Sequence, residues 1–254
     1  MFENRKMSKV IWDGKQRHTP RRFLMRNKNP GIDNLKEQLM DDVIFYDNGH
    51  KFENPVKNCD TEVLLIEGDT FTVAKQFPNS CCLNFASDKI PGGGYTVPEI
   101  NAQEEDLFRR SNLPILMDND IVKSFYPLVG LQGFYCPTVI VNKDGNLEFQ
   151  TSFETSVITL AAVRNPKPGE EQLCKDKIER VLYIAMDNDV ETLILGAWGS
   201  GVFRCSPRFM ANGFVHYLEN KFKNVFRTVI FAIPDENGKN YMAYEEELKK
   251  NNLI

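Results

Sequence analysis

Two glycine-rich loops, each placed directly after a short apolar run, constrain this chain more than any other feature. Pro91–Gly94 follows the run CCLNFA at residues 81–86, and GAWGSGVF at residues 196–203 follows TLIL at residues 192–195. Glycine lets backbone N–H groups approach a phosphate because it has no Cβ, and a helix beyond the loop adds the positive end of its dipole. Since such loops meet at the strand ends of an open α/β sheet, the pair favours a phosphate-bearing ligand.

Neither loop fits a familiar nucleotide-binding or nucleophile motif. Neither is followed by Gly-Lys-Ser or Gly-Lys-Thr, so neither is a Walker loop, and neither has the G-x-G-x-x-G spacing of a dinucleotide-binding turn. Ser200 is not a nucleophile-elbow serine, because Trp198 stands where that motif needs its first glycine. Taken singly, each loop is better explained as a tight structural turn, so only their combination points to a ligand.

Apolar runs alternate with helical patterns along most of the chain. The runs that predict strands are Glu62–Ile66, Cys81–Ala86, Thr138–Val141, Val157–Leu160, Thr192–Leu195 and Val229–Ile233. The patterns that predict helices are Phe71–Phe77, Gln103–Arg110, Ile121–Leu128, Leu173–Met186, Pro207–Leu218 and Tyr241–Lys250. Ser206 and Pro207 give the best start signal, with serine as the N-cap and proline at the first helical position. This alternation predicts a three-layer α/β fold with a largely parallel or mixed sheet.

The first 50 residues differ from the rest because they lack a clear hydrophobic period, apart from a short helical stretch at residues 34–40. We interpret residues 1–50 as an N-terminal accessory segment and residues 51–254 as the main domain. The stretch KQRHTPRRFLMRNK at residues 15–28 is rich in lysine and arginine. A solvated basic arm explains this stretch better than a flap that contacts phosphate.

Composition narrows the classes of partner. The chain has 254 residues and a formal net charge of −4, whereas a protein that grips a polyanion along its length usually has a strong basic excess. No apolar run of about eighteen residues and no apolar signal region occur, so we expect no membrane contact and a cytoplasmic location, with nuclear access left open. None of the 6 cysteines forms a Cys-x-x-Cys pair and the 3 histidines are scattered, so we expect no metal and no cofactor.

Gln103-Glu104-Glu105 begins after the eight residues that follow the glycine triplet, and it supports two interpretations. In one, Asn101 caps a helix and Glu104 completes a capping box. In the other, both carboxylates reach one ligand from the first helical turn. The spacing alone gives these two interpretations equal weight. Acid catalysis of glycoside cleavage needs a carboxyl that is protonated near neutral pH, whereas a helix N-terminus lowers a carboxylate pKa. The second interpretation therefore requires Glu105 to be buried against apolar surface or beside the Glu104 charge.

The glycine triplet and the Gln-Glu-Glu triplet, in this order and spacing, resemble the signature of the poly(ADP-ribose) glycohydrolases. Four segments between about Glu62 and Asp235 resemble the microbial type of that family, in the family's order: CCLNFASDKIPGGG, AQEEDLFRRSNL, LILGAWGSGVFRCSP and VIFAIPD. The resemblance implies a macrodomain-like three-layer sandwich, a mixed sheet between helices, which binds ADP-ribose in a cleft at the strand ends. It also implies a hydrolase that cleaves the ribose–ribose O-glycosidic bonds of ADP-ribose polymers and releases ADP-ribose. The acidic charge balance favours cleavage from chain ends.

The resemblance assigns roles to the residues that match its motifs. Glu105 would protonate the leaving ribose oxygen and then act as base on the attacking water. Glu104 would hold the ribose hydroxyls, and Gln103 would support the loop. The contacts to the distal ribose and diphosphate would come from Gly92, Gly93, Gly94, Gly199, Ser200, Gly201 and Val202, and Phe203 would lie near the adenosine.

Four positions need separate treatment. The residues alone make Asp69 an N-cap of the helix that begins near Thr70, while the resemblance makes it a candidate contact of the adenine amino group. Ser200 stands where the family often has cysteine. Ser87 stands where related macrodomains often place an asparagine on the distal ribose. Asn84 is the other candidate for that ribose, although it has the opposite strand parity from Ser87.

The partners that the resemblance implies are ADP-ribose polymers or ADP-ribosylated protein, and nucleic acid is expected only as an ADP-ribosylated substrate. Two other functions stay open at this point. One is hydrolysis of another ADP-ribosyl linkage, on mono-ADP-ribosylated protein, nucleic acid or a signalling nucleotide. The other is a non-catalytic macrodomain that binds ADP-ribose, which would not need two glutamates at this spacing.

Overall fold

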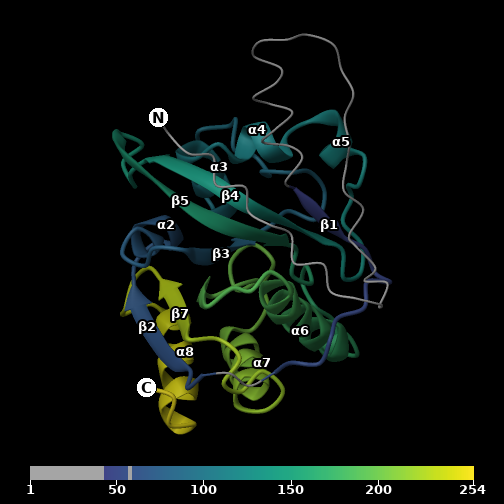
Figure 1. Cartoon of the computed structure of the whole chain (residues 1–254), viewed down its shortest axis with the longest axis vertical. Coiled ribbons are helices and arrows are strands. Elements are labelled where there is room, and N and C mark those ends of the chain that lie inside the picture. Colours follow the sequence, from purple (N-terminus) through teal and green to yellow (C-terminus); the bar gives the residue numbers. More distant parts are fainter. Residues whose placement is uncertain (1–42, 57–58) are drawn as a thin grey trace, which may run out of the picture.

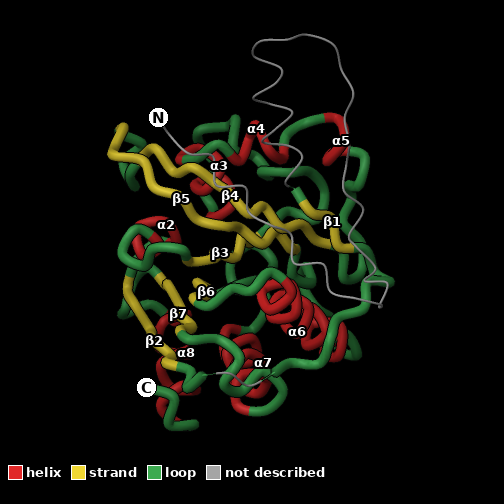
Figure 2. The backbone as a smooth tube through the Cα atoms, viewed as in Figure 1, coloured by secondary structure: helices red, strands yellow, loops and turns green. Residues whose placement is uncertain are grey.

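A mixed seven-stranded sheet lies between two layers of helices in the computed structural model, which describes residues 43–56 and 59–254 (Figure 1, Figure 2). The helical stretch predicted at residues 34–40 and the basic stretch at residues 15–28 lie outside the described residues. The strands are β1 (Ile44–Tyr46), β2 (Glu62–Glu67), β3 (Ser80–Phe85), β4 (Gly133–Lys143), β5 (Phe149–Leu160), β6 (Thr192–Leu195) and β7 (Thr228–Ile233). The helices are α2 (Thr70–Ala74), α3 (Gln103–Arg110), α4 (Leu113–Met117), α5 (Asp120–Lys123), α6 (Glu171–Asp187), α7 (Pro207–Glu219) and α8 (Lys239–Lys250).

The order of the strands places β3 in the middle of the sheet, between β5 and β6. The full order is β1-β4-β5-β3-β6-β7-β2. β3 pairs in parallel with both neighbours, and β7 pairs in parallel with β6 and β2, whereas β4 runs antiparallel to β5 and β1. The C-terminal ends of β2, β3, β5, β6 and β7 therefore lie along one edge, and the loops that follow them meet there.

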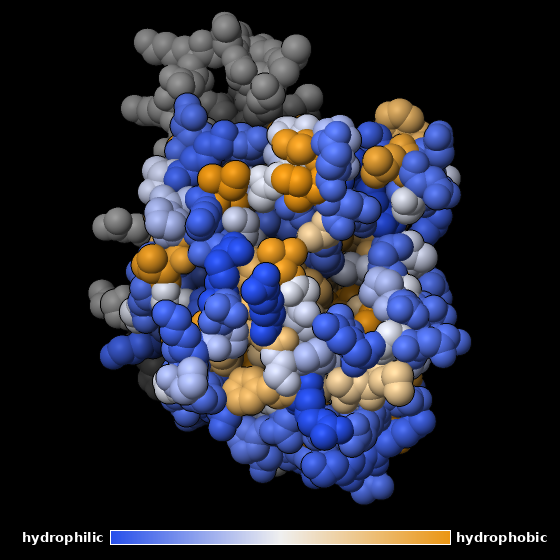
Figure 3. All heavy atoms as spheres, turned by 180° about the vertical axis from the view of Figure 1, so that it is seen from behind, coloured by the Kyte–Doolittle hydropathy of each residue, from blue (hydrophilic) through white to orange (hydrophobic). Residues whose placement is uncertain are grey.

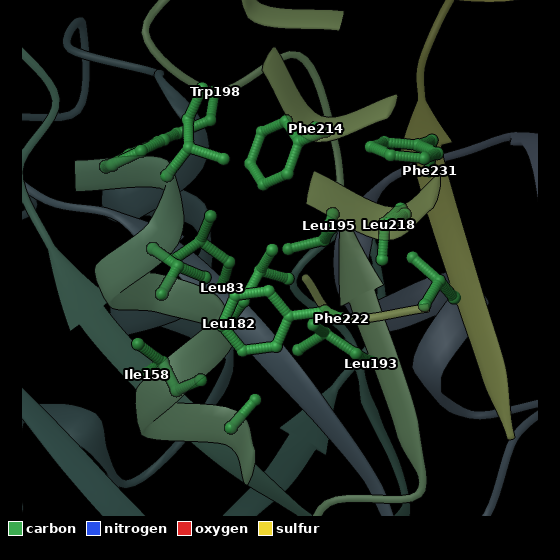
Figure 4. Close-up of a cluster of buried hydrophobic side chains, with 14 of the residues drawn as sticks. Leu83, Ile158, Leu182, Leu193, Leu195, Trp198, Phe214, Leu218, Phe222 and Phe231 are labelled. Atoms are coloured by element: carbon green, nitrogen blue, oxygen red, sulfur yellow. The ribbon is translucent and has the colours of Figure 1, made fainter. Parts of the chain in front are cut away.

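Each face of the sheet has its own apolar core. On one face, α6, α7 and α8 cover a cluster in which Phe214 contacts both Trp198 and Phe231 (Figure 4), with ring centroids 6.4 and 5.7 Å apart. On the other face, α2 to α5 cover a second cluster that includes Phe71 and Phe108. Full burial of a large apolar side chain stabilises a fold by about 1.5–3 kcal/mol. The two cores thus hold the sheet rigid on both sides of the edge where the glycine loops lie.

Local sequence accounts for several of these elements. In α6 the buried apolar positions recur at helical spacing: Ile178, Val181, Leu182 and Ala185. α7 begins at Pro207, and the Oγ of Ser206 accepts a hydrogen bond from the N–H of Phe209 at 3.4 Å. This geometry confirms the predicted N-cap and the predicted helix start.

Some predicted boundaries are wrong. The helix predicted at Ile121–Leu128 ends at Lys123 in α5, and the chain continues in turns towards Pro127, which lacks the N–H that a longer helix would need. β4 and β5 extend well beyond the predicted runs, since they pair with each other as a long antiparallel hairpin. The sequence pattern did not predict α4 or β1. β1 lies within the segment predicted to be accessory and pairs with β4, while the domain boundary at residue 50 stays a prediction.

The described surface is mostly polar. On the face shown in Figure 3, hydrophobic residues form small patches separated by hydrophilic ones. No helix among the described residues is long and apolar enough to cross a membrane. Across residues 43–56 and 59–254, no group of three or more His, Cys, Asp and Glu side chains could hold a metal ion.

Candidate active site

A cleft of about 690 Å³ opens at the edge of the sheet where the loops after the parallel strands meet. The first turn of α3 and both glycine loops line it, together with residues that follow β2, β3, β5 and β7. The volume falls within the range of about 300–1,000 Å³ that is usual for small-molecule sites. The topology alone therefore brings the two motifs of the sequence, which are about a hundred residues apart, to one ligand-sized site.

Gln103 fixes the start of α3 against the end of β3. Its Oε1 accepts a hydrogen bond from the N–H of Phe85 at 2.8 Å, and its Nε2 donates to the carbonyl of Leu83 at 2.8 Å and to Thr70 Oγ at 3.0 Å. The N-cap of α3 is Ala102, which has extended backbone and no capping side chain. The capping-box interpretation with Asn101 is therefore wrong, and the two glutamates are free to make other contacts.

Glu104 is a buried carboxyl surrounded by N–H donors. It is 3% exposed, and its Oε2 accepts from the N–H of Ser87 at 2.7 Å. Its Oε1 accepts from the N–H of Gly92 at 3.1 Å and from Asn84 Nδ2 at 3.3 Å. Burial raises the pKa of Glu104 to about 7, the Glu105 charge adds to this rise, and the three N–H donors oppose it. Glu104 therefore titrates near neutral pH and ties the first glycine loop to β3.

Glu105 lies beside Glu104 and faces the cleft. It is 7% exposed, so the burial required by the catalytic interpretation is present. Its Oε1 accepts from the N–H of Gly94 at 2.9 Å, the only hydrogen bond to this carboxylate within the described part of the chain. Gly93 has φ +54°, and a Cβ there would lie 2.4 Å from Glu105 Oε1 and 3.1 Å from Glu104 Oε2. Both carboxylates thus lie so close to Gly93 that only glycine fits at this position.

The second glycine loop presents mainly backbone atoms, rather than polar side chains, to the cleft. Gly199, Gly201, Val202 and Phe203 line the cleft. A Cβ at Gly201 would meet nothing within 4 Å, so this stretch is open on the cleft side. Behind it, the indole N–H of the buried Trp198 donates to the carbonyl of Leu160 at 3.2 Å. Ser200 does not line the cleft, and its buried Oγ has no hydrogen-bond partner among the described residues.

Asp69 is the N-cap of α2, as the residues alone predict, and it also lines the cleft. Its Oδ1 accepts from the N–H of Thr72 at 2.9 Å and from Arg110 at 2.6 Å, and its Oδ2 accepts from the Thr72 hydroxyl at 2.5 Å. Burial raises the pKa of Asp69, but the hydrogen bonds from Thr72 and the Arg110 charge outweigh burial, so the net pKa is lowered. Asp69 is thus a fixed anion in the wall of the cleft, and its contact with adenine stays a prediction.

Asn84 and Ser87 lie at different depths. Asn84 is fully buried and donates to Glu104 and to Thr159 Oγ1, at 3.3 Å in each case, so it supports Glu104 from below. Ser87 lines the cleft, where its N–H is used by Glu104 and its Oγ accepts from the N–H of Lys89 at 3.2 Å. A direct contact of either residue with a ribose stays a prediction.

Arg164 is a cleft residue that the sequence did not predict. Its guanidinium lies 3.9 Å from the centroid of the Phe203 ring, and its Nε and Nη2 donate to Asp88 Oδ1 at 3.2 and 2.6 Å. The acidic residues that line the cleft are Asp69, Glu104, Glu105 and Asp106. The described cleft-lining cations are Arg164, whose side chain is 40% exposed, and Arg110, which is 1% exposed between two aspartates. Arg164 is therefore the accessible positive charge of this site.

The topology of the sheet explains why the sequence did not predict Arg164 as a cleft residue. Arg164 follows β5, and β5 pairs in parallel with β3, which puts Arg164 next to the loop after β3 that carries Ser87 and Asp88. Nothing in the local sequence around Arg164 indicates that neighbour. Only a correct prediction of the strand order would have placed Arg164 beside the loop after β3.

The fold and the cleft define an α/β protein of the macrodomain-like type with a pair of buried glutamates. The family model for the microbial-type PARG catalytic domain, where PARG denotes poly(ADP-ribose) glycohydrolase, matches residues 21–140. That range includes the first glycine loop and the Gln-Glu-Glu triplet, and it begins within the segment predicted to be accessory. The match confirms the predicted resemblance to the microbial-type poly(ADP-ribose) glycohydrolases. No curated protein matches the sequence.

Solved structures share the fold. Poly(ADP-ribose) glycohydrolase from Deinococcus radiodurans, in complex with ADP-ribose, is 24% identical with a TM-score of 0.73, and the match covers 88% of this chain and 99% of that one. The enzyme from Thermomonospora curvata is also 24% identical, with a TM-score of 0.75 over 84% of this chain and 88% of that one. The same enzyme bound to the inhibitor ADP-HPD has a TM-score of 0.70. These matches confirm the predicted macrodomain-like three-layer fold.

Proposed function

We propose that this chain is a poly(ADP-ribose) glycohydrolase, which hydrolyses the ribose–ribose O-glycosidic bonds of ADP-ribose polymers and releases ADP-ribose. One observation carries the proposal: Glu104 and Glu105 lie side by side in a cleft, and each accepts a backbone N–H from the first glycine loop. A protein that only binds ADP-ribose has no need of two buried carboxyls at one glycine. The family match over this region supports the same reaction.

In the proposed reaction Glu105 is the acid and then the base. Its carboxyl donates a proton to the oxygen of the leaving ribose as the bond from the anomeric carbon to that oxygen breaks. The electron pair of the broken bond stays on the departing oxygen, and the sugar left behind has oxocarbenium-like character. A water then adds to the anomeric carbon and gives its proton to Glu105, which restores the acid.

Glu104 and the glycine loops position the substrate in this proposal. Glu104 titrates near neutral pH, so it can exchange hydrogen bonds with ribose hydroxyls as donor or acceptor. The open backbone around Gly201 suits the diphosphate, and Arg164 supplies the accessible positive charge that a dianionic group needs among four carboxylates. In this proposal Asp69 accepts a hydrogen bond from the amino group of adenine. No step of this scheme calls for a metal or a cofactor.

The test is to incubate the protein with poly-ADP-ribosylated protein and to quantify free ADP-ribose. We expect release by the wild type and a loss of about 10³-fold in kcat for Glu105→Gln, with ADP-ribose binding by calorimetry retained. Tight binding without release by the wild type would indicate a reader instead. Release only from mono-ADP-ribosylated protein or nucleic acid would move the activity to another ADP-ribosyl linkage, and full activity of Glu105→Gln would remove Glu105 from the mechanism.

A further inference from the structure

The segment between the first glycine loop and α3, residues 95–101, forms defined turns although little packing holds it. We call it the strap. Residues 96–101 are exposed. The strap nevertheless folds as successive turns, in which the N–H of Val97 donates to the carbonyl of Gly94 at 2.8 Å and the N–H of Ile100 donates to Val97 at 3.1 Å. Such exposed turns carry little apolar burial, so another interaction must fix their shape.

Arg109, in the last turn of α3, provides that interaction. Its Nε donates to the carbonyl of Tyr95 at 2.9 Å, and its Nη2 donates to the carbonyls of Val97 and Ile100 at 2.8 and 2.6 Å. Its Nη1 donates to Asn101 Oδ1 at 3.4 Å. One guanidinium, which has five N–H donors in a planar fork, thus satisfies three strap carbonyls and one strap side chain.

A second tether holds only the start of the strap. The hydroxyl of Tyr95 donates to Asp118 Oδ2 at 2.6 Å, and Asp118 pairs with Lys123 at 2.5 Å. The ring of Tyr95 packs on Phe108 with centroids 5.3 Å apart. Beyond Tyr95, the described side-chain contacts to strap carbonyls come from Arg109. The remainder of the strap therefore depends on this arginine.

The strap is coupled to Glu105 through Gly94. The N–H of Gly94 makes the hydrogen bond to Glu105 Oε1, and the carbonyl of Gly94 accepts from Val97 in the strap. The side chain of Ile100 also closes over Gly94, since a Cβ there would lie 2.5 Å from Ile100 Cδ1. A shift of the strap would move the donor that orients Glu105.

We propose that Arg109 is a positioning residue that acts on Glu105 through the strap, a role that rests on the proposed glycohydrolase function. The fork of hydrogen bonds, rather than the positive charge, does the positioning. Lysine keeps the charge but presents one ammonium on a flexible stem, which cannot reach three separate carbonyls at once. Arg109→Lys is therefore a substitution that separates geometry from charge.

The experiment compares Arg109→Lys with Arg227→Lys. Arg227 makes an exposed ion pair with Glu191, and its side chain has no hydrogen bond or ion pair with a cleft-lining residue in the part of the chain that the structure describes, which makes it the matched control. For Arg109→Lys we expect kcat on ADP-ribose polymer to fall by about 10- to 100-fold, with KM and ADP-ribose affinity changed by less than about threefold. We also expect faster amide hydrogen exchange at Tyr95, Val97 and Ile100, and an altered pH profile of kcat. The control should match the wild type in every measurement.

Two results would overturn the proposal. One is wild-type kcat and wild-type strap exchange in Arg109→Lys. The other is a loss of activity that follows only the fraction of folded protein, with the pH profile and strap exchange unchanged, because this would be a purely structural effect. Arg109→Ala adds a second check, since added guanidinium ion should partly restore its kcat and ammonium ion should not. If the wild type itself releases no ADP-ribose, the proposed function fails, and strap exchange in Arg109→Lys still decides whether Arg109 holds the strap.

Discussion

The two glycine loops lie at the same edge of the sheet, but they are held in place in different ways. The first loop is held from the cleft side, where Glu104 and Glu105 accept the N–H groups of Gly92 and Gly94. The second loop is held from behind, where Trp198 and a hydrogen bond from Cys205 to the carbonyl of Gly199 anchor it to the core. In the first loop the contacts that hold the backbone are therefore also the contacts that orient the two carboxyls on which the proposed mechanism depends.

This difference separates two kinds of contribution to catalysis. Under the proposed mechanism, a change in the first loop moves Glu105, which acts as the bond breaks, so it should lower kcat. A change in the second loop would, under the same proposal, alter contacts that the substrate makes before and during the reaction, so it should raise KM. The substitutions below test this division.

Gly93→Ala should have the largest effect in this series. Alanine at φ +54° is strained, and its Cβ would lie 2.4 Å from Glu105 Oε1, so Glu105 must move. We expect kcat for ADP-ribose release to fall by about 100-fold. Gly169→Ala is the matched control, because Gly169 has φ +97° but a Cβ there meets nothing within 4 Å. If both variants lose activity equally, backbone strain rather than the contact with Glu105 is responsible.

The sequence predicted those parts of the site that depend on neighbours along the chain. It predicted the bounds of α3 and the cap of α7, and strand parity separated Asn84 from Ser87. It could not decide between a capping box and a cleft for Glu104, because the donors Gly92 and Ser87 arrive from a loop that folds back. Arg164 was missed for the related reason that its partner Asp88 belongs to another strand's loop, and only the strand order brings the two together.

Glu104 should link stability to pH in a way that distinguishes it from an ordinary surface carboxylate. Its folded pKa is about 7 and its ordinary value is 4.5, so between these pH values the folded state binds a proton that the unfolded state has released. The free energy of unfolding attributable to Glu104 therefore falls as pH rises through this window, by on the order of 3 kcal/mol. Denaturant titrations of the wild type and Glu104→Gln from pH 4 to 8 measure the difference. A difference that stays constant across this window would show that Glu104 is not protonated in the folded state.

Arg164→Gln should affect binding more than chemistry. Loss of the accessible cation among four cleft carboxylates would remove an attraction for the diphosphate of the proposed substrate, so we expect KM and the ADP-ribose dissociation constant to rise by about 10-fold with kcat nearly unchanged. The effect should weaken as salt is added. Arg227→Gln, which breaks an exposed ion pair with Glu191, is the control. A loss confined to kcat would mean that Arg164 acts near the glutamates instead.

Ser200→Ala should have the smallest effect on activity, and its effect on stability should be favourable. The buried Oγ of Ser200 has no partner among the described residues, so removing it relieves a desolvation cost of about 1 kcal/mol, while the backbone N–H stays. We expect a higher free energy of unfolding and little change in kcat or KM. Ser206→Ala is a control of opposite sign, because Ser206 caps α7 and its loss should cost about 1 kcal/mol. If Ser200→Ala instead weakens ADP-ribose binding, the hydroxyl serves the ligand, and the second loop contributes more than its backbone.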